Sequence, residues 1–425
     1  MPPVGWYAVV LVVAAAVTAA LTPLARWFSV KTGYVSLPDP RMVHNRPTPS
    51  GGGSAMFLGF LVAMIVAAAV PALHPVFSGS SEPLGVVLAA AAIFAVGLID
   101  DVRDMSAPAK VAGEVLAASI LYFMGVTMYQ FKIPLAGFIV LGPSVVPLIT
   151  ALWVIALTNA VNVIDGLDGL AAGIVAIGSG ALAVYGLRLM DLNILPANNI
   201  GPLVAVIACG ICLGFLPFNF HPAKIFMGDA GSLFLGLLMS ASTMVIGGRL
   251  PPRTSGTTYF FYAPLLIPIF ILGVPLIDMA FAFIRRTAHG TTFHTPDRNH
   301  IHHRLLRLGH GHRRSVVILW AWTALLSGFI LFPLFVHQVN AIIPFGVAAL
   351  AIGLYTFFHP GLRQGADPDL DPASGAAGPV PGPAANGAAP PAPDPVAPVG
   401  NGAVGAAPPH PGEALSGTGP GGPNP

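Results

Sequence analysis

Charge is scarce in this chain. Lysine, arginine, aspartate and glutamate make up 8% of its 425 residues, whereas a soluble domain carries about 25%. Hydrophobic residues account for 55% of the chain, and its mean hydropathy is +0.77. The shortage of charge excludes an ordinary soluble protein. We therefore expect an all-α polytopic protein whose solvent is the bilayer, with no nucleic acid partner.

Cysteine is almost absent. Cys209 and Cys212 are the two in the chain, which excludes a disulfide scaffold. They lie in the apolar run A-C-G-I-C-L-G. A CxxC pair can bind a metal or perform redox chemistry, but two small packing residues are the simpler interpretation at membrane depth. No internal repeat of 20–50 residues is visible either.

The first apolar stretch, Val4 to Ala25, lacks the basic residues that precede a signal peptide core. Arg26 and Lys31 follow it instead, and a cleaved signal peptide has the opposite arrangement. The stretch is long enough to cross about 30 Å of hydrocarbon. We expect a retained span with its N-terminus outside.

Apolar stretches of spanning length recur along the chain, and they predict eleven transmembrane helices. Their approximate bounds are 4–25, 52–72, 84–100, 108–125, 144–163, 167–187, 202–219, 231–248, 258–284, 315–336 and 340–358. An odd number of spans places the two termini on opposite sides of the membrane.

The basic residues set the orientation. With the N-terminus outside, fifteen of the 19 lysines and arginines lie inside, and Lys132, Arg188, Arg249 and Arg253 lie outside. The positive-inside rule favours this arrangement. We expect a multi-pass protein of the plasma (inner) membrane with a cytoplasmic C-terminus.

Two segments depart from the helical pattern. Thr127 to Pro143, on the outer side, predicts a short hairpin at the interface. From about Gly361 the chain is rich in Pro, Gly and Ala and poor in aliphatic residues, so it cannot bury enough surface to fold. We predict a catalytic membrane domain over 1–358 and a disordered cytoplasmic tail over 359–425.

Four polar clusters interrupt the apolar chain, all on the predicted cytoplasmic side. They are G-L-I-D-D (97–101), N-A-V-N-V-I-D-G-L-D-G-L (159–170), F-M-G-D-A-G-S-L (226–233) and P-D-R-N-H-I-H-H-R-L (296–305). Carboxylates, amides, histidines and arginines at one membrane face suit an enzyme that handles a metal ion and phosphates beside lipid.

The first cluster pairs Asp100 with Asp101, and Lys110 follows nine residues later. Adjacent carboxylates repel each other unless a cation or proton relieves the repulsion. A divalent metal or a general-base role would explain the pair. A solvated helix end is an equally simple explanation of this cluster taken alone.

The second cluster repeats a spacing of three. Asn159 and Asn162 share it, and so do Asp165 and Asp168, which predicts that each pair lies on one helix face. Ionisable and amide side chains at a membrane are costly and mark functional sites. Polar contacts between helices are the alternative.

The third cluster places Asp229 at the start of a span. A carboxylate there either caps the helix or binds a hard cation such as Mg²⁺. Phe226 is of a type that stacks on nucleobases, although a lone phenylalanine usually serves packing.

The fourth cluster lies in a region that holds seven of the 13 histidines, between His289 and His312. Its arginines and imidazoles suit diphosphate recognition. A zinc site is an alternative, without a cysteine or HExxH pattern to support it, and a basic inner loop explains the arginines alone.

In this order and on these loops, the four clusters resemble the polyprenyl-phosphate N-acetylhexosamine-1-phosphate transferase family over roughly residues 26–310. The resemblance implies integral membrane enzymes that move a sugar 1-phosphate from a UDP-sugar onto a polyprenyl phosphate and release UMP. It implies Mg²⁺ as cofactor, with Mn²⁺ as a substitute. The oligomeric state stays open, with a homodimer as one option.

The resemblance also implies roles for residues of the first three clusters. Asp229 would bind Mg²⁺ together with Asn162. Asp168 and Phe226 would hold the uracil, by hydrogen bond and by stacking. Lys110 would lie near the phosphates.

The remaining residues complete the implied site. Asp100 and Asp101 match paired aspartates proposed as the base that readies the polyprenyl phosphate. Asp165 matches an acidic position near the nucleotide or the catalytic centre. The last group would grip the diphosphate or complete the family's histidine motif, and its members are Arg298, His300, His302 and His303.

The histidine loop bears on the sugar. H-I-H-H-R-L resembles the bacterial undecaprenyl- or decaprenyl-phosphate branch that uses UDP-N-acetylglucosamine, so we expect N-acetylglucosamine 1-phosphate. A phospho-N-acetylmuramoyl-pentapeptide transferase is the alternative. A secondary transporter is the rival from another class, but it would place its charges near the midplane and show repeats.

Overall fold

The computed structural model describes residues 4–36, 47–133, 137–248, 311–336 and 342–358. These residues all belong to the first of two compact units, Met1–Pro372. The second unit, Ala373–Pro425, lies outside the described residues. The predicted tail and its boundary at 358/359 are therefore left as predictions.

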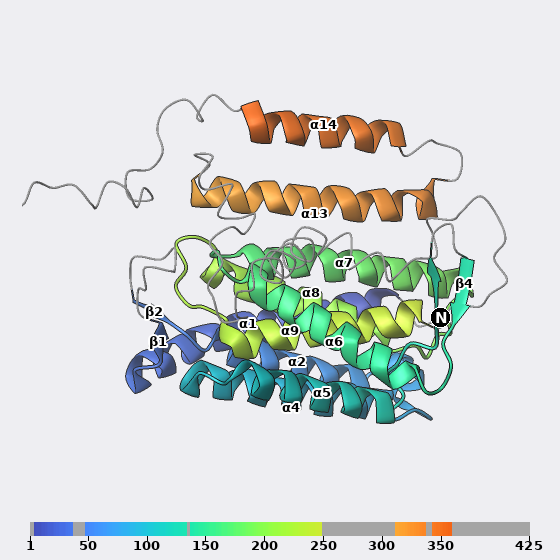
Figure 1. The fold of residues 1–425 in the computed structure, drawn as a ribbon, viewed down its shortest axis with the longest axis horizontal. Helices are drawn as coiled ribbons and strands as arrows, with labels where there is room; N and C mark the ends of the chain where they lie inside the picture. The colour runs from blue at the N-terminus through green and yellow to red at the C-terminus, as the bar shows by residue number, and fades with distance from the viewer. Residues whose placement is uncertain (1–3, 37–46, 134–136, 249–310, 337–341, 359–425) are drawn as a thin grey trace, which may run out of the picture. The chain divides into compact units, whose positions relative to one another are not determined.

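Long apolar helices lie side by side through the described part of the chain (Figure 1). They are α1 (Val4–Thr32), α2 (Gly52–Ala69), α4 (Glu82–Arg103), α5 (Ala107–Phe123), α6 (Val146–Ile164), α7 (Leu170–Asp191), α8 (Gly201–Asn219), α9 (Gly228–Gly247), α13 (His312–Phe335) and α14 (Ile342–Phe358). A short 3-10 turn, η1 (Pro71–Leu73), and α3 (His74–Phe77) follow α2. Eight of these helices are long and apolar enough to cross a membrane. Helices α5 and α14 have 17 residues each, about 25 Å, which is near the shortest length that spans.

The predicted all-α polytopic fold is confirmed. Ten of the eleven predicted stretches coincide with described helices, and the stretch 258–284 lies outside the described residues. The predicted hairpin is also confirmed, because β3 (Gln130–Ile133) pairs antiparallel with β4 (Gly137–Val140). A second small pair joins β1 (Val35–Ser36) to β2 (Thr48–Pro49). The total number of spans and their orientation remain predictions.

Helix α9 forms the centre of the described helices. Every residue from Ala230 to Gly247 is buried, because the helix packs against α2, α4, α6, α7 and α8. Small residues allow this close packing. A Cβ added to Gly97 of α4 would lie 2.5 Å from the Cα of Ala230, and one added to Gly236 would lie 2.4 Å from the Cα of Thr158 on α6. The backbones of α4 and α6 are therefore pressed against α9.

Backbone hydrogen bonds tie the start of α2 to the loop before α9. The amide of Gly52 donates to the carbonyl of Phe226 at 2.9 Å, and that of Gly53 donates to Met227 at 3.0 Å. The amide of Phe226 in turn donates to Pro49 at 2.9 Å. These bonds fix the loop that leads into α9 and thereby the position of the first turn of that helix.

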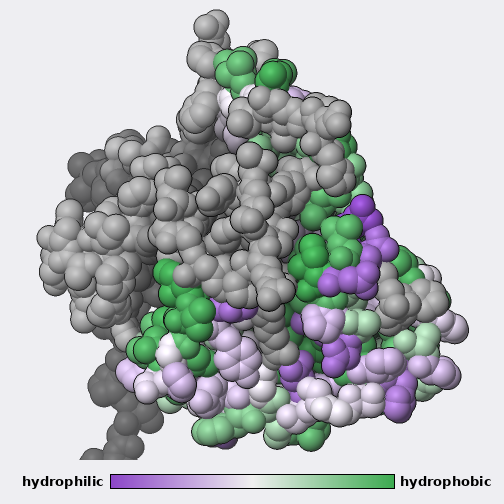
Figure 2. Space-filling view, turned by 90° about the vertical axis from the view of Figure 1, so that its right-hand side faces the viewer, coloured by the Kyte–Doolittle hydropathy of each residue, from purple (hydrophilic) through white to green (hydrophobic). Residues whose placement is uncertain are grey.

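Figure 2 looks onto the end of the helices that carries β4. Hydrophilic residues spread across the lower right of this view, with hydrophobic residues among and above them. Such a mixture is expected at the ends of membrane-spanning helices, because the loops that join the helices lie in polar surroundings outside the hydrocarbon. The first three clusters lie elsewhere, at the end of α4, at the end of α6 with the loop that follows it, and at the start of α9.

Replacing Gly97 by valine should separate α4 from α9. The new side chain would meet the backbone of Ala230, and overpacking of this kind costs about 1–3 kcal/mol. Thermal unfolding in detergent should show a lowered Tm. The same change at Gly346 of α14, where an added Cβ meets nothing within 4 Å, is the matched control. Equal Tm losses in both variants would contradict the close contact.

Candidate functional site

The ammonium of Lys110 lies between two carboxylates from other helices. Its Nζ is 2.8 Å from Oδ2 of Asp100 and forms an ion pair with Oδ2 of Asp229. The Lys110 side chain is 16% exposed and that of Asp100 is 12% exposed. A charge withdrawn from water in this way needs partners, so three residues from α4, α5 and α9 form one electrostatic unit. The predicted solvated helix end does not apply to Asp100.

The turn between α4 and α5 brings Asp100 and Lys110 together. Asp104 ends α4 in the left-handed region, with φ 44°. The amide of Met105 then donates to Oδ1 of Asp100 at 2.7 Å. One oxygen of Asp100 therefore stabilises the turn, and the other holds the lysine.

Asp101 has a different task from its neighbour. Its Oδ1 accepts the amide of Asp229 at 2.7 Å, and its Oδ2 accepts the amide of Ala230 at 3.0 Å. Helix α9 has no side-chain cap at its own N-cap residue, Met227. Asp101 thus caps α9 from α4, and the capping role that the sequence left open for Asp229 belongs to Asp101.

Gly228 makes this cap geometrically possible. It has a φ of +70°, and an added Cβ would lie 2.5 Å from Oδ2 of Asp101. Tyr34, which follows α1, also lies beside this carboxylate. Burial, together with the charge of Asp101, raises the pKa of Tyr34. The phenol is therefore neutral at physiological pH.

The two asparagines of the second cluster separate into different environments. Nδ2 of Asn162 donates to Oδ1 of Asp229 at 2.8 Å and to Oγ of Ser232 at 2.9 Å. Nδ2 of Asn159 instead donates to Oε1 of Glu114 at 2.8 Å. Asn162 therefore belongs to the site. Asn159 supplies the polar contact between helices that the sequence left open as an alternative.

Glu114 is a buried acid that the sequence analysis missed. It is 0% exposed, and its Oε1 also accepts from Oγ of Thr158 at 3.2 Å. It follows Lys110 by one turn on α5. An E inside an apolar stretch was the available signal, because an acid is rarely buried without a partner.

Asp165 and Asp168 do not share a helix face, contrary to the prediction. Helix α6 ends at Ile164 and α7 begins at Leu170, so both acids lie in the connecting loop, where Gly169 has a φ of +78°. Burial raises the pKa of Asp165 well above its usual range, and the nearby carboxylates, chiefly Asp229, raise it further.

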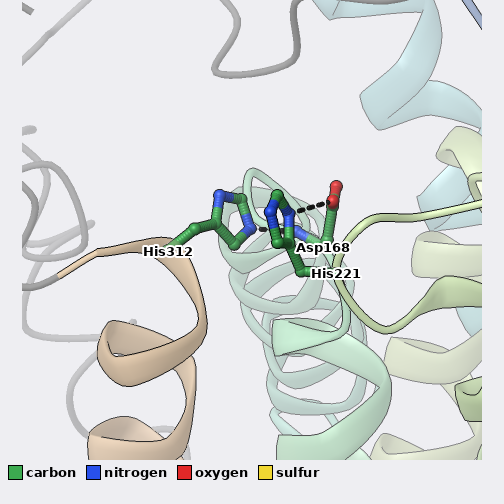
Figure 3. A group of neighbouring side chains, drawn as sticks. All are labelled: Asp168, His221 and His312. Carbon is green, nitrogen blue, oxygen red and sulfur yellow. Dashed lines mark hydrogen bonds and ion pairs between the residues drawn. The ribbon is translucent and has the colours of Figure 1, made fainter.

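Asp168 contacts two histidines and a backbone amide (Figure 3). Its Oδ2 lies 2.7 Å from Nδ1 of His221 and accepts the amide of Ala223 at 3.0 Å. Its own amide donates to Nε2 of His312 at 3.0 Å. The sequence analysis missed His221, because a single histidine in F-N-F-H-P-A carries no pattern that points to Asp168.

Other predicted site residues are only partly placed. Phe226 is half-buried beside the first turn of α9, and its backbone pairs with the segment before α2. Its predicted stacking on uracil stays a prediction. The remaining predicted residues lie outside the described residues, and they are Arg298, His300, His302 and His303.

The donor set around Asp229 fits a hard cation. The carboxylates of Asp100 and Asp229 already share one positive charge, the ammonium of Lys110. Asn162 uses its amide nitrogen in both of the hydrogen bonds described above. Its amide oxygen and the carboxylates are the oxygen ligands that Mg²⁺ prefers.

Comparison with known proteins places this site in a family. The profile of glycosyl transferase family 4 matches residues 83–247, which include the first three clusters. The decaprenyl-phosphate N-acetylglucosaminephosphotransferase of Mycobacterium tuberculosis (strain ATCC 25618 / H37Rv) is 37% identical over 383 residues. That alignment covers 86% of this chain and 92% of the relative.

Two further relatives are named for different substrates. A probable undecaprenyl-phosphate N-acetylglucosaminyl 1-phosphate transferase of Bacillus subtilis (strain 168) is 37% identical over 311 residues, which are 73% of this chain and 78% of the relative. A phospho-N-acetylmuramoyl-pentapeptide-transferase of Desulforudis audaxviator (strain MP104C) is 33% identical over 229 residues, which are 49% of this chain and 66% of the relative.

Lys110→Met should destabilise the protein. The change leaves two half-buried carboxylates facing each other without a cation, and breaking a buried pair costs at most about 3–5 kcal/mol. Unfolding in detergent without divalent metal should show a lowered Tm. Adding Asp100→Asn to Lys110→Met should restore part of the loss, because one of the two negative charges is removed. A double variant less stable than the single one would contradict the ion-pair interpretation.

Asp165→Asn should stabilise the metal-free protein in a pH-dependent way. The folded-state pKa of Asp165 lies above its unfolded value, which is about 3.9. Ionisation of Asp165 therefore costs stability as the pH rises from about 4 toward the folded pKa, and the full cost persists above it. With EDTA present, the variant's Tm advantage should be larger at pH 8 than at pH 5. An advantage independent of pH would contradict the raised pKa.

Proposed function

The chain belongs to glycosyl transferase family 4, and we propose that it transfers N-acetylglucosamine 1-phosphate from UDP-N-acetylglucosamine to a polyprenyl phosphate. The products are UMP and polyprenyl-diphosphate-N-acetylglucosamine, the lipid-linked first intermediate of a cell-envelope glycan. The reaction takes place at the cytoplasmic face of the plasma membrane. The observation that carries this proposal is the buried start of α9, where Asp229 meets Lys110 and Asn162.

The relatives support the sugar and the acceptor. The Mycobacterium tuberculosis and Bacillus subtilis proteins are named for N-acetylglucosamine phosphate transfer to decaprenyl or undecaprenyl phosphate, and both align over most of this chain. The muramoyl-pentapeptide enzyme aligns over about half of it. The arrangement of the histidine loop, H-I-H-H-R-L, favours the same sugar.

The proposed cofactor is Mg²⁺, with Mn²⁺ as a substitute. Asp229 and Asn162 would hold it, because the side chain of Asn162 on α6 lies against the Asp229 carboxylate on α9 and leaves its amide oxygen free of the two hydrogen bonds that its nitrogen donates. When bound, the cation neutralises charge on the diphosphate and stabilises the leaving UMP.

Among the residues that the structure describes, Lys110 is the cation held at this site and would meet a phosphate there. Its ammonium is paired with Asp100 and Asp229, and a lysine rotates its three N–H donors easily. A diphosphate that enters the site can therefore share this cation with the carboxylates. Asp100 keeps the ammonium in place, since it also anchors the turn between α4 and α5.

Asp101 acts on the reaction through α9. Both of its oxygens accept amides from the first turn of that helix, so it positions Asp229 rather than removing a proton. This assignment replaces the base role that the resemblance implies for Asp101. The fixed helix supplies the orientation on which phosphoryl transfer chiefly depends.

The reaction needs little base catalysis. A polyprenyl phosphate is already ionised near neutral pH, so one of its oxygens can attack the sugar-bearing phosphorus directly. The bond from that phosphorus to the oxygen of UMP breaks, and UMP leaves. The engagement of Asp100 and Asp101 in other contacts supports direct attack over a covalent aspartyl intermediate.

A transfer assay tests the proposal. Purified protein, Mg²⁺ and a polyprenyl phosphate should move label from UDP-N-acetylglucosamine, but not from UDP-muramoyl-pentapeptide, into the lipid phase. Asp229→Asn should lower the rate by at least about 10²-fold, the loss expected when one charge-stabilising group is removed.

Asp191→Asn is the matched control. Asp191 ends α7 and forms an exposed ion pair with Arg188, away from the clusters, so its loss should leave transfer unchanged. Label from the pentapeptide donor alone would keep the reaction type and overturn the sugar. No transfer by folded protein from either donor would overturn the proposed function.

A further inference from the structure

Asp168, His221 and His312 form a compact group at the ends of three different segments. One ligand atom from each lies within 4.8 Å of the others, and all three side chains are half-buried. The two imidazole rings stack with their centroids 4.3 Å apart. Figure 3 shows both histidines turned toward Asp168, His221 from the loop before α9 and His312 from the first residue of α13.

The potential metal-ligand atoms of this group lie close together. Nε2 of His312 accepts a hydrogen bond from the amide of Asp168, so it carries a lone pair rather than a proton. Nδ1 of His221 and Oδ2 of Asp168 lie 2.7 Å apart and share a proton between them. A metal ion that replaces this proton finds one oxygen and two nitrogen ligands, and metal binding to such groups releases protons.

The surrounding contacts hold the three ligands in place. Oδ2 of Asp168 accepts the amide of Ala223 at 3.0 Å. Oδ1 of Asn219 accepts the amide of Gly169 at 3.1 Å, and Nδ2 of Asn219 donates to Ile225 at 3.1 Å. The loops after α6 and α8 are therefore bound to each other. Supporting bonds of this kind orient ligands in metal sites.

The start of α13 is tied to the same loops. Nε of Arg313 donates to the carbonyl of His221 at 3.1 Å, and Nε1 of Trp320 donates to Leu170 at 3.4 Å. The ring of Trp320 also lies 5.6 Å from that of Phe220, centroid to centroid. These contacts hold the start of α13 in place and thereby hold His312 beside Asp168.

We infer that Asp168, His221 and His312 bind a divalent transition metal, with Zn²⁺ as the best match. Two imidazoles and a carboxylate suit Zn²⁺, whereas the carboxylate and amide oxygens near Asp229 suit Mg²⁺. The two sites therefore differ in ligand chemistry. The sequence raised a zinc site for the histidine-rich region from His289 to His312. The site inferred here uses one histidine of that region, His312, with partners from two other loops.

The bound metal would act as a clamp. It would join the loop between α6 and α7, the loop before α9 and the first residue of α13. Three protein ligands leave at least one position for water. Asp168 is also the residue that the resemblance assigns to the uracil, so the test of the clamp changes the two histidines and measures zinc binding and stability rather than transfer.

Two substitutions at His221 separate a metal site from a hydrogen-bonded contact. His221→Asn can still donate to Asp168 but offers a poor metal ligand, so it should keep the fold and lose zinc. His221→Asp places a carboxylate near the position of Nδ1. It repels Asp168 in the absence of metal and should regain stability when zinc binds.

The experiment uses the full chain without a polyhistidine tag, stripped with a chelator. Zn²⁺ content after dialysis, a calorimetric titration with Zn²⁺ and the visible absorption of Co²⁺ measure binding. Wild type should bind one equivalent. His221→Asn and His312→Gln should weaken binding by more than the 10- to 100-fold typical of losing a supporting residue. Zn²⁺ should raise the Tm of His221→Asp more than that of wild type.

Two other histidines are controls. His74→Gln, on α3, should bind zinc like wild type, because His74 lies outside the group. His302→Gln tests the fourth cluster. Absence of zinc binding by folded wild type overturns the proposal. So does zinc binding that survives His221→Asn and His312→Gln or disappears in His302→Gln. If His221→Asn does not fold, the Tm response of His221→Asp to Zn²⁺ decides, and no gain over wild type overturns the proposal.

Discussion

The capping of α9 by Asp101 is the interaction on which the site depends. Helix α9 is buried along its length, so the free amides of its first turn cannot rely on water and would be costly if left unpaired. Asp101 accepts two of them from α4. It can do so because Gly97 lets α4 approach Ala230 and Gly228 leaves space for the carboxylate. The side chain of Asp229 is fixed as a consequence.

The same arrangement gathers negative charge at one place. Asp100 and Asp229 share the ammonium of Lys110, and the carboxylate of Asp101 is held by amides. Asp165 has a raised pKa because it is buried near other carboxylates. Among the described residues, these four acids are accompanied by one lysine, so their negative charge exceeds the positive charge beside them. This composition is the physical basis of the proposed Mg²⁺ site, since a divalent cation would offset the excess of negative charge.

The fold could be predicted from the sequence because eight of the described helices are apolar runs of spanning length. The site was harder. The spacing of Asp100 and Asp101 identified a pair, but only packing shows that one holds Lys110 and the other caps α9. Asn159 and Asn162 have equivalent positions in the pattern, yet Glu114 draws one of them away. His221 and His312 are 91 positions apart, and no periodicity could have joined them to Asp168.

The second cluster contributes residues to both of the proposed metal sites. Asn162 faces Asp229 from the last turn of α6, whereas Asp168 faces two imidazoles from the loop that follows. The end of α6 at Ile164 causes this division, because a continuous helix would place Asp165 and Asp168 on the same face. Asn162 therefore lies beside Asp229 at the start of α9, whereas the imidazoles of His221 and His312 lie beside the loop that carries Asp168. One short loop thereby connects the acids beside Asp229 to the start of α13 and keeps the oxygen donors apart from the imidazoles.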